Sequence, residues 1–78
     1  MPTYRGHKNW NHWNVSLWIN NDQSLYELAK SCVYHAGTKD RAARDMLDAL
    51  HEVGLTHTKD GAPYSFSTIR EAINKIES

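Results

Sequence analysis

Residues 43–76 read ARDMLDALHEVGLTHTKDGAPYSFSTIREAINKI and contain the clearest start and stop signals of the chain. Apolar residues at helical spacing lead up to Gly54, and glycine commonly ends a helix in the left-handed conformation. Asp60-Gly61 is a typical tight-turn pair, and the hydroxyl residues between 65 and 68 are typical of a helix start. The stretch therefore predicts a helix, a small hairpin and a second helix.

Two features of this segment leave alternatives open. Thr56 to Thr58 favours an extended strand that could pair with Ala62 to Tyr64, but Pro63 cannot donate a ladder hydrogen bond. We therefore expect either a short edge hairpin or an ordered, wing-like loop. Ser67 or Thr68 is expected to cap the last helix, and Thr68-Ile69-Arg70-Glu71 fits the capping-box pattern. Its inward side is expected to comprise Ile69, Ala72, Ile73 and Ile76.

Two further helices are expected upstream, over residues 23–36 and from 39 to about 53. Each follows a residue that can cap a helix and precedes a glycine: Asp22 and Gly37 for the first, Thr38 and Gly54 for the second. The inward face of the first would be formed by Leu25, Leu28, Ala29, Cys32 and Ala36. The inward face of the second would be formed by Ala43, Met46, Leu47, Leu50 and Val53.

The first helix is expected from Trp10 to about Asn20, with Asn9 as its cap. Apolar residues in residues 14–20 also alternate with polar ones, so a strand remains the alternative there. We expect residues 1–8 to form a loose arm and residues 9–78 to form a single compact helical domain. The predicted fold class is all-α, with four short helices and a small hairpin or wing-like loop between the third and the fourth.

The composition is that of a small globular domain. The 78 residues include nine Lys or Arg and nine Asp or Glu, so no global field draws the chain to a polyanion. Cys32 is the only cysteine, which excludes an intrachain disulfide and a cysteine-rich zinc module. No apolar run approaches the length of a membrane span. We therefore expect a soluble, cytoplasmic protein that does not enter membranes.

The C-terminal half resembles the DNA-contacting helix–loop–helix segment of the large serine recombinases. The matching elements, over about 34 residues, are Leu47, Leu50, Gly54-Leu55, Thr58, Gly61, Tyr64 and Ser65 through Arg70. This resemblance implies that the last helix meets DNA through Ser67, Thr68, Arg70, Glu71 and Asn74. The chain departs from that family in carrying Glu71 where a second basic residue is common, and in lacking a nuclease domain, so it is not itself a recombinase.

The N-terminal half resembles small uncharacterised proteins that are common in phages and mobile elements. Residues 9–22 read NWNHWNVSLWINND, and the family signature is Asn-Tyr-x-Thr-Trp-x-Val-x-Leu-Trp. Trp10 and His12 replace its Tyr and Thr. The resemblance implies a phage accessory protein, a class in which inhibitors of host defence such as anti-CRISPR proteins are frequent.

The residue types of the last helix suit base recognition. Ser67, Arg70 and Asn74 share one side of the helix, and Arg and Asn can read guanine and adenine through paired hydrogen bonds. Phosphates would be held by Lys75, beside this side, and by Lys59 and His57 on the hairpin. The alternative is a solvated polar face with Glu71 and Lys75 as a routine helical pair. Arg41 and Arg44 could extend the surface, but Asp45 and Asp48 follow at pairing distance.

The aromatic residues of the N-terminal half support a second interpretation. Most of Trp10, Trp13, Trp18 and Tyr26 would be core, yet a helix with apolar residues on two sides cannot bury both sides in one thin domain. Tryptophan is enriched at binding hot spots, so one side is a candidate protein interface. A homodimer remains open, because two-fold symmetry would let so small a protein read two half-sites.

The sequence does not indicate metal binding or catalysis. The chain has five histidines, and one of them forms a Cys32-x-x-His35 motif. This spacing is not a recognised zinc pattern, so we expect no metal and no other cofactor. There is no phosphate-binding glycine loop and no nucleophile with an orienting base. The sequence therefore predicts a non-enzymatic binding protein with an accessory or regulatory role. DNA is the leading partner, and a host defence protein, inhibited by occlusion of its surface, is the alternative.

Overall fold

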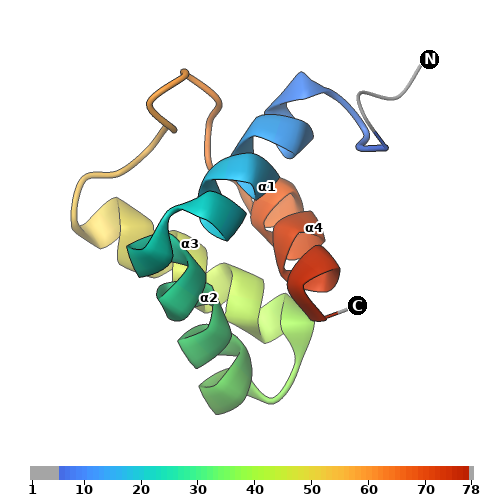
Figure 1. Ribbon diagram of the computed structural model, residues 1–78. Helices are drawn as coiled ribbons and strands as arrows, with labels where there is room; N and C mark the ends of the chain where they lie inside the picture. Colours follow the sequence, from blue (N-terminus) through green and yellow to red (C-terminus); the bar gives the residue numbers. More distant parts are fainter. Residues whose placement is uncertain (1–5, 78) are drawn as a thin grey trace.

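The described part of the chain contains four helices, shown as a computed structural model in Figure 1. The structure describes residues 6–77, with only the backbone of Glu77, so most of the expected N-terminal arm lies outside the described residues. The helices are α1 (Trp10–Asn21), α2 (Gln23–Ala36), α3 (Lys39–Glu52) and α4 (Phe66–Glu77). The all-α class is confirmed, and residues 14–20 are helical rather than extended.

Three of the helices begin at the capping residues that the sequence indicates. In each case the cap side chain accepts a hydrogen bond from the backbone N–H three residues later, which satisfies one donor of the first turn. The pairs are Asn9 with His12, Asp22 with Leu25 and Thr38 with Arg41. The three caps therefore fix where the chain turns between the arm, α1, α2 and α3.

The start of α4 differs from the expectation. The helix begins at Phe66, and its cap is Ser65 rather than Ser67 or Thr68. The Ser65 hydroxyl accepts from the Thr68 N–H at 3.3 Å, and the Thr68 hydroxyl accepts from the Ser65 N–H at 2.9 Å. A reciprocal capping box is present, but it starts at Ser65, two residues before Ser67. Its second member is Thr68, where the usual capping box has Glu or Gln. Glu71 takes no part in it.

The end of α3 also differs from the expectation at one residue. Gly54 is left-handed with φ of +84°, as expected. The Leu55 N–H donates to the Leu50 carbonyl at 2.8 Å and the Gly54 N–H donates to the His51 carbonyl at 3.0 Å. These two bonds form a Schellman motif that ends the helix at Glu52. Val53 is consequently 71% exposed, and its expected inward position is wrong.

The core lies between two packed pairs of helices. α1 packs on α4, α2 packs on α3, and α3 joins the pairs by packing on α4 (Figure 1). All four helices and the loop before α4 contribute buried apolar side chains: Val15, Ile19, Ala29, Ala42, Ala43, Met46, Leu50, Ala62, Tyr64, Ile69, Ala72 and Ile73. Leu25, Leu28, Cys32 and Ile76 pack against this core while partly buried. The inward faces of α2 and α4 thus agree with the helical periodicity.

A short hairpin occupies residues 56–64 between α3 and α4. His57 and Pro63 form one antiparallel bridge, flanked by hydrogen bonds from Thr58 to Ala62 (2.8 Å) and from Tyr64 to Thr56 (2.9 Å). The Gly61 N–H closes the turn on the Thr58 carbonyl, with φ of +99° at the glycine. Pro63 occupies a non-hydrogen-bonded position of this bridge, where a backbone N–H would point away from the partner strand, so its missing donor is tolerated there.

Side-chain hydrogen bonds connect the hairpin to α1. The Thr58 hydroxyl, which is buried, donates to Asn14 Oδ1 at 2.5 Å. Asn14 Nδ2 and Trp18 Nε1 each donate to Asp60 Oδ2 at 2.9 Å. No buried side-chain nitrogen or oxygen of the described residues lacks a hydrogen-bond partner. These bonds connect residues more than 40 positions apart, so they are tertiary contacts that hold the hairpin against α1.

We predict that Asn14→Ala destabilises the protein by about 2–3 kcal/mol, because it leaves the buried Thr58 hydroxyl without its acceptor and removes a donor to Asp60. Urea unfolding followed by far-UV circular dichroism measures the change. Asn20→Ala is the matched control on the same helix, since Asn20 is exposed and bonds only within α1. If both variants lose the same free energy of unfolding, the role of Asn14 in connecting α1 to the hairpin is contradicted.

Candidate functional site

The two residues expected to read bases from α4 are paired within the molecule. Arg70 Nε donates to Asp40 Oδ1 at 2.5 Å, and Asn74 Oδ1 accepts from Lys39 Nζ at 3.0 Å. Both partners lie in the first turn of α3. The polar side of α4 therefore faces α3, and its recognition groups are engaged by another helix.

The other residues expected to contact nucleic acid do not gather beside Arg70. Thr68 is 3% exposed and serves the cap, so its expected place at a reading surface is corrected. Ser67 and Lys75 are exposed on α4. Lys59 Nζ lies 5.6 Å from the centre of the Trp18 ring, and His57 bonds the Thr56 hydroxyl. The basic hairpin residues thus lie against α1, while Arg70 lies against α3.

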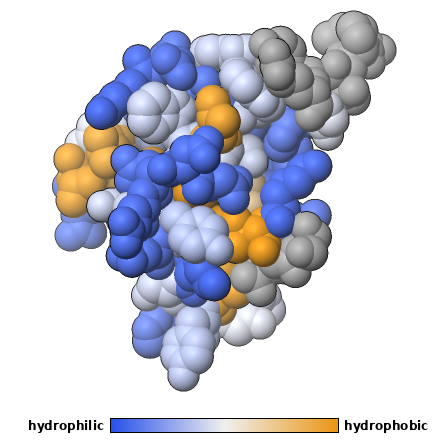
Figure 2. All heavy atoms as spheres, in the orientation of Figure 1, coloured by the Kyte–Doolittle hydropathy of each residue, from blue (hydrophilic) through white to orange (hydrophobic). Residues whose placement is uncertain are grey.

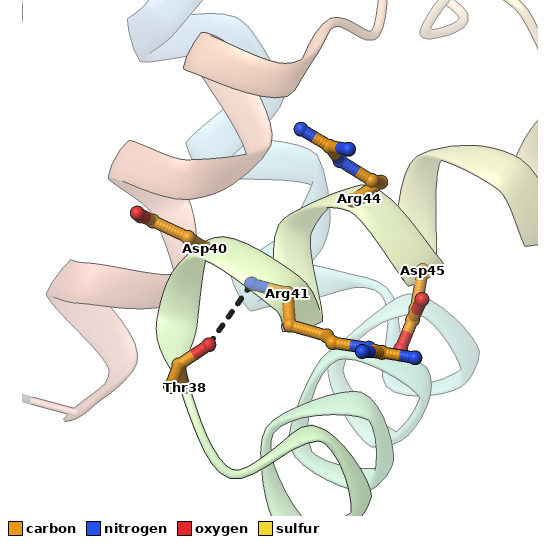
Figure 3. Close-up of a pocket in the computed structure, with 5 residues that line it drawn as sticks. All are labelled: Thr38, Asp40, Arg41, Arg44 and Asp45. Atoms are coloured by element: carbon orange, nitrogen blue, oxygen red, sulfur yellow. Dashed lines mark hydrogen bonds between the residues drawn. The ribbon is translucent and has the colours of Figure 1, made fainter.

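Two arginines of α3 border a shallow polar hollow of about 490 Å³ at the start of that helix, which we call the Arg41 hollow. Its lining residues are Thr38, Asp40, Arg41, Arg44 and Asp45 (Figure 3). Figure 3 shows Arg41 extended toward Asp45 while Arg44 points away from them. Among the described residues, neither arginine forms an ion pair, so the expected pairing with Asp45 and Asp48 is absent.

Glu71 lies between two histidines that sequence reasoning did not connect with it. Its carboxylate oxygens bond His7 Nδ1 at 2.8 Å and His12 Nδ1. A carboxylate only accepts, so an ionised Glu71 requires a proton on Nδ1 of both rings. The cluster fastens the start of α1 to the middle of α4. A local sequence pattern could not predict this cluster, because 59 and 64 residues separate Glu71 from the two histidines.

No group of three or more His, Cys, Asp or Glu side chains among the described residues could hold a metal ion. Cys32 is half-buried, and burial, followed by the nearby Asp45 charge, raises the pKa of its thiol. It therefore stays protonated at neutral pH, which makes it a poor nucleophile.

α1 is polar on much of its buried side and apolar on its outer side. His12, Asn14 and Ser16 are buried together with Val15 and Ile19. Trp10 and Leu17, seven residues apart and hence two turns along one side, each remain 37% exposed. Trp13 lies between them and is partly buried. We call Trp10, Trp13 and Leu17 the α1 outer face.

Trp18 and Tyr26, which were also expected at an interface, are partly buried and contact other side chains of the same molecule. Trp18 donates to Asp60 and has Lys59 over its ring, and Tyr26 has Lys30 at 5.5 Å from its ring centre. Of the four aromatic residues expected at an interface, Trp10 is the exposed one. It shares the outer face with Leu17, which was not among the residues expected at an interface.

A second hollow, of about 230 Å³, lies where the hairpin meets α1 and the start of α2. Its apolar lining comprises Trp18, Leu25, Leu55 and Tyr64, and its polar lining comprises Asp22, Ser24, His57 and Lys59. We call it the Trp18 hollow. Burial, and then the Asp22 charge, raises the pKa of Tyr64. The Tyr64 hydroxyl is therefore neutral and available as a hydrogen-bond donor.

Val53 and Leu55 form an exposed apolar patch, and Leu55 also lines the Trp18 hollow. Figure 2 shows this patch at the left edge of the molecule, where Figure 1 places the end of α3 and the residues that follow. Val53 is 71% exposed and Leu55 is 45% exposed. Both flank Gly54, whose left-handed conformation ends α3 and turns these side chains outward.

We predict that Asp60 makes stability depend on acidity. Hydrogen bonds from Asn14 and then from Trp18 hold the pKa of its carboxyl below the usual range. The stabilisation is therefore fully present above about pH 4 and is lost as the pH falls through the lowered native pKa. Melting temperatures measured between pH 7 and pH 2.5 should fall less steeply for Asp60→Asn than for the unchanged protein.

Asp48→Asn is the control for this experiment, since it removes an exposed carboxylate of α3 that forms no hydrogen bond or ion pair among the described residues. It should reproduce the acid dependence of the unchanged protein more closely than Asp60→Asn does. A reversed order of the two variants would show that the Asn14 and Trp18 bonds do not stabilise the ionised form.

None of the helices in the described part of the chain has the length and apolar character that a membrane span requires. No curated protein and no solved structure matches the chain. A family model matches it over residues 1–78, and that family is described as one of unknown function, DUF7249. The match spans the whole chain, and the protein belongs to this family.

Proposed function

We propose that this protein is a non-enzymatic binding domain whose α1 outer face recognises another protein. The observation that carries the proposal is the exposure of Trp10 and Leu17 on the same side of a helix that buries polar residues. Removing apolar surface from water contributes about 25 cal/mol per Å². Tryptophan at the centre of an interface is among the side chains that contribute most to binding.

The internal bonds of α1 support this use of its outer face. His12 is bonded to Glu71 of α4, and Asn14 and Trp18 are bonded to the hairpin. The helix is therefore held from two directions, and its outer residues are presented by a rigid element. Binding through such a surface orders few additional groups, which lowers its entropic cost.

The arrangement of charged residues supports a protein partner over a nucleic acid. The chain has nine basic and nine acidic residues, and Arg70 and Asn74 are engaged by α3. A partner approaching α1 meets aromatic and aliphatic surface instead. We propose that the protein acts by covering a surface of its partner, as an inhibitor or accessory subunit does, without chemical change to it.

Site-specific photocrosslinking in the producing cell tests this proposal. A benzophenone amino acid at position 17 should give one discrete crosslinked protein, because Leu17 lies on the outer face. The same group at Tyr34, which is 84% exposed near the end of α2, is the control and should not give that product. The partner identified in this way is then purified for binding measurements.

Trp10→Ala and Leu17→Asp should each weaken binding to that partner at least about tenfold, as expected for truncated hot-spot residues. Isothermal titration calorimetry measures the affinity, and circular dichroism shows that the helices are intact. If both variants bind the partner as tightly as the unchanged protein does, or if position 34 gives the same crosslinked product, the assignment of the α1 outer face is overturned.

Contact with DNA is the second candidate, favoured by one observation. Arg41 and Arg44 form no ion pair among the described residues, and the neighbouring Asp40 connects α3 to Arg70 of α4. We propose that, if DNA is bound, these arginines hold phosphates beside α4. This surface differs from the expected one, because it lies on α3 and excludes the hairpin lysine.

A gel shift with random duplex at about 50 mM salt tests the DNA candidate. The Arg41→Ala and Arg44→Ala double variant should lose binding, and it should lower the slope of log affinity against log salt by about two. Lys30→Ala is the control, since Lys30 lies on α2 beside Tyr26. No shift at this salt concentration, or an unchanged slope in the double variant, would eliminate the candidate.

A further inference from the structure

The patch at the end of α3 combines a protruding apolar residue with a recess of matching character. Val53 is the most exposed aliphatic side chain among the described residues, at 71%. Two residues later, Leu55 lines the Trp18 hollow together with Trp18, Leu25 and Tyr64. An exposed valine thus lies two residues from a residue that lines a partly apolar recess.

The Schellman turn explains why this valine is exposed. The left-handed Gly54 and the bond from the Leu55 N–H to the Leu50 carbonyl end α3 and reverse the chain direction. Residues on both sides of the glycine then point away from the core. A polar residue at position 53 would satisfy this geometry equally well, since the capping bonds are made by the backbone. The valine is therefore not required by the turn, and it adds exposed apolar surface beside Gly54.

The charged residues of the hollow have opposite signs. Lys59 and Asp22 both line it, and neither forms an ion pair among the described residues. The Asp22 carboxylate caps α2, and the Lys59 ammonium lies over the Trp18 ring. A two-fold interface is self-complementary, because each contact between residues of two copies occurs twice. A patch with one cation, one anion and an apolar centre meets this requirement.

We propose that a second copy of this chain covers the patch, with Val53 of each copy seated in the Trp18 hollow of the other. Lys59 of one copy then approaches Asp22 of the other. The formal net charge is zero, so no overall repulsion opposes association of two copies. A standard interface of about 800 Å² per partner would cover roughly a sixth of the 4977 Å² surface.

This self-association is separate from recognition through the α1 outer face. Trp10 and Leu17 lie outside the lining of the Trp18 hollow, so a dimer leaves them available. Each copy would present one outer face, and the dimer would present two. The dimer therefore binds a partner with two equivalent sites, and either proposal can fail without the other.

Sedimentation equilibrium over about 10 µM to about 1 mM tests the dimer. The mass should rise with concentration from the 9.0 kDa of the monomer toward twice that value. Val53→Asp should abolish the rise, because a buried carboxylate would face the apolar hollow. Lys59→Glu should shift the midpoint to at least about tenfold higher concentration, since it places like charges opposite each other.

Tyr34→Asp is the matched control, since Tyr34 is 84% exposed near the end of α2 and should leave the association unchanged. In the unchanged protein, amide and indole NMR signals of Leu55 and Trp18 should shift with concentration. These signals report the interface without any substitution, so a misfolded variant does not obscure the result. A protein that stays at 9.0 kDa throughout, or a Val53→Asp variant that still dimerises, would overturn the proposal.

Discussion

The fold depends on the requirement that polar side chains buried on α1 find hydrogen-bond partners elsewhere in the chain. An unpaired buried polar group costs on the order of 1–3 kcal/mol, a large share of the stability of so small a domain. His12 meets Glu71 of α4, and Asn14 meets Thr58 and Asp60 of the hairpin. These bonds place α1 across α4 and bring the hairpin down onto α1. The position of the Trp18 hollow and the exposure of Trp10 and Leu17 follow from this arrangement.

The same constraint leaves apolar side chains of α1 exposed. α1 uses part of its buried side for hydrogen bonding, so aromatic and aliphatic residues such as Trp10 and Leu17 remain outside. α3 ends in a backbone-capped turn that leaves Val53 outside as well. In a protein of 78 residues the interior is too small to take every apolar side chain. Exposed apolar groups on rigid elements are the usual basis of association, and both proposals for protein contacts rest on them.

The charged residues have mainly intramolecular roles where the sequence suggested recognition. Arg70 and Asn74 connect α4 to the first turn of α3, and Glu71 connects α4 to α1. α4 is thus the helix against which two others are oriented by polar contacts. The arginines that remain outside ion pairs in the described part of the chain lie on α3, which moves any nucleic-acid surface away from the predicted residues.

The sequence by itself determined the local structure, because caps, glycines and apolar periodicity act over a few residues. It placed α2 at its observed bounds, placed α3 to within one residue and identified Asn9, Asp22 and Thr38 as caps. It missed the Ser65 cap because several hydroxyl residues compete between 65 and 68. Only the tertiary structure decided which polar residues meet. The partners of Arg70, Asn14 and Glu71 lie 30 to 64 positions away, and side-chain pairing over such separations depends on how the helices pack.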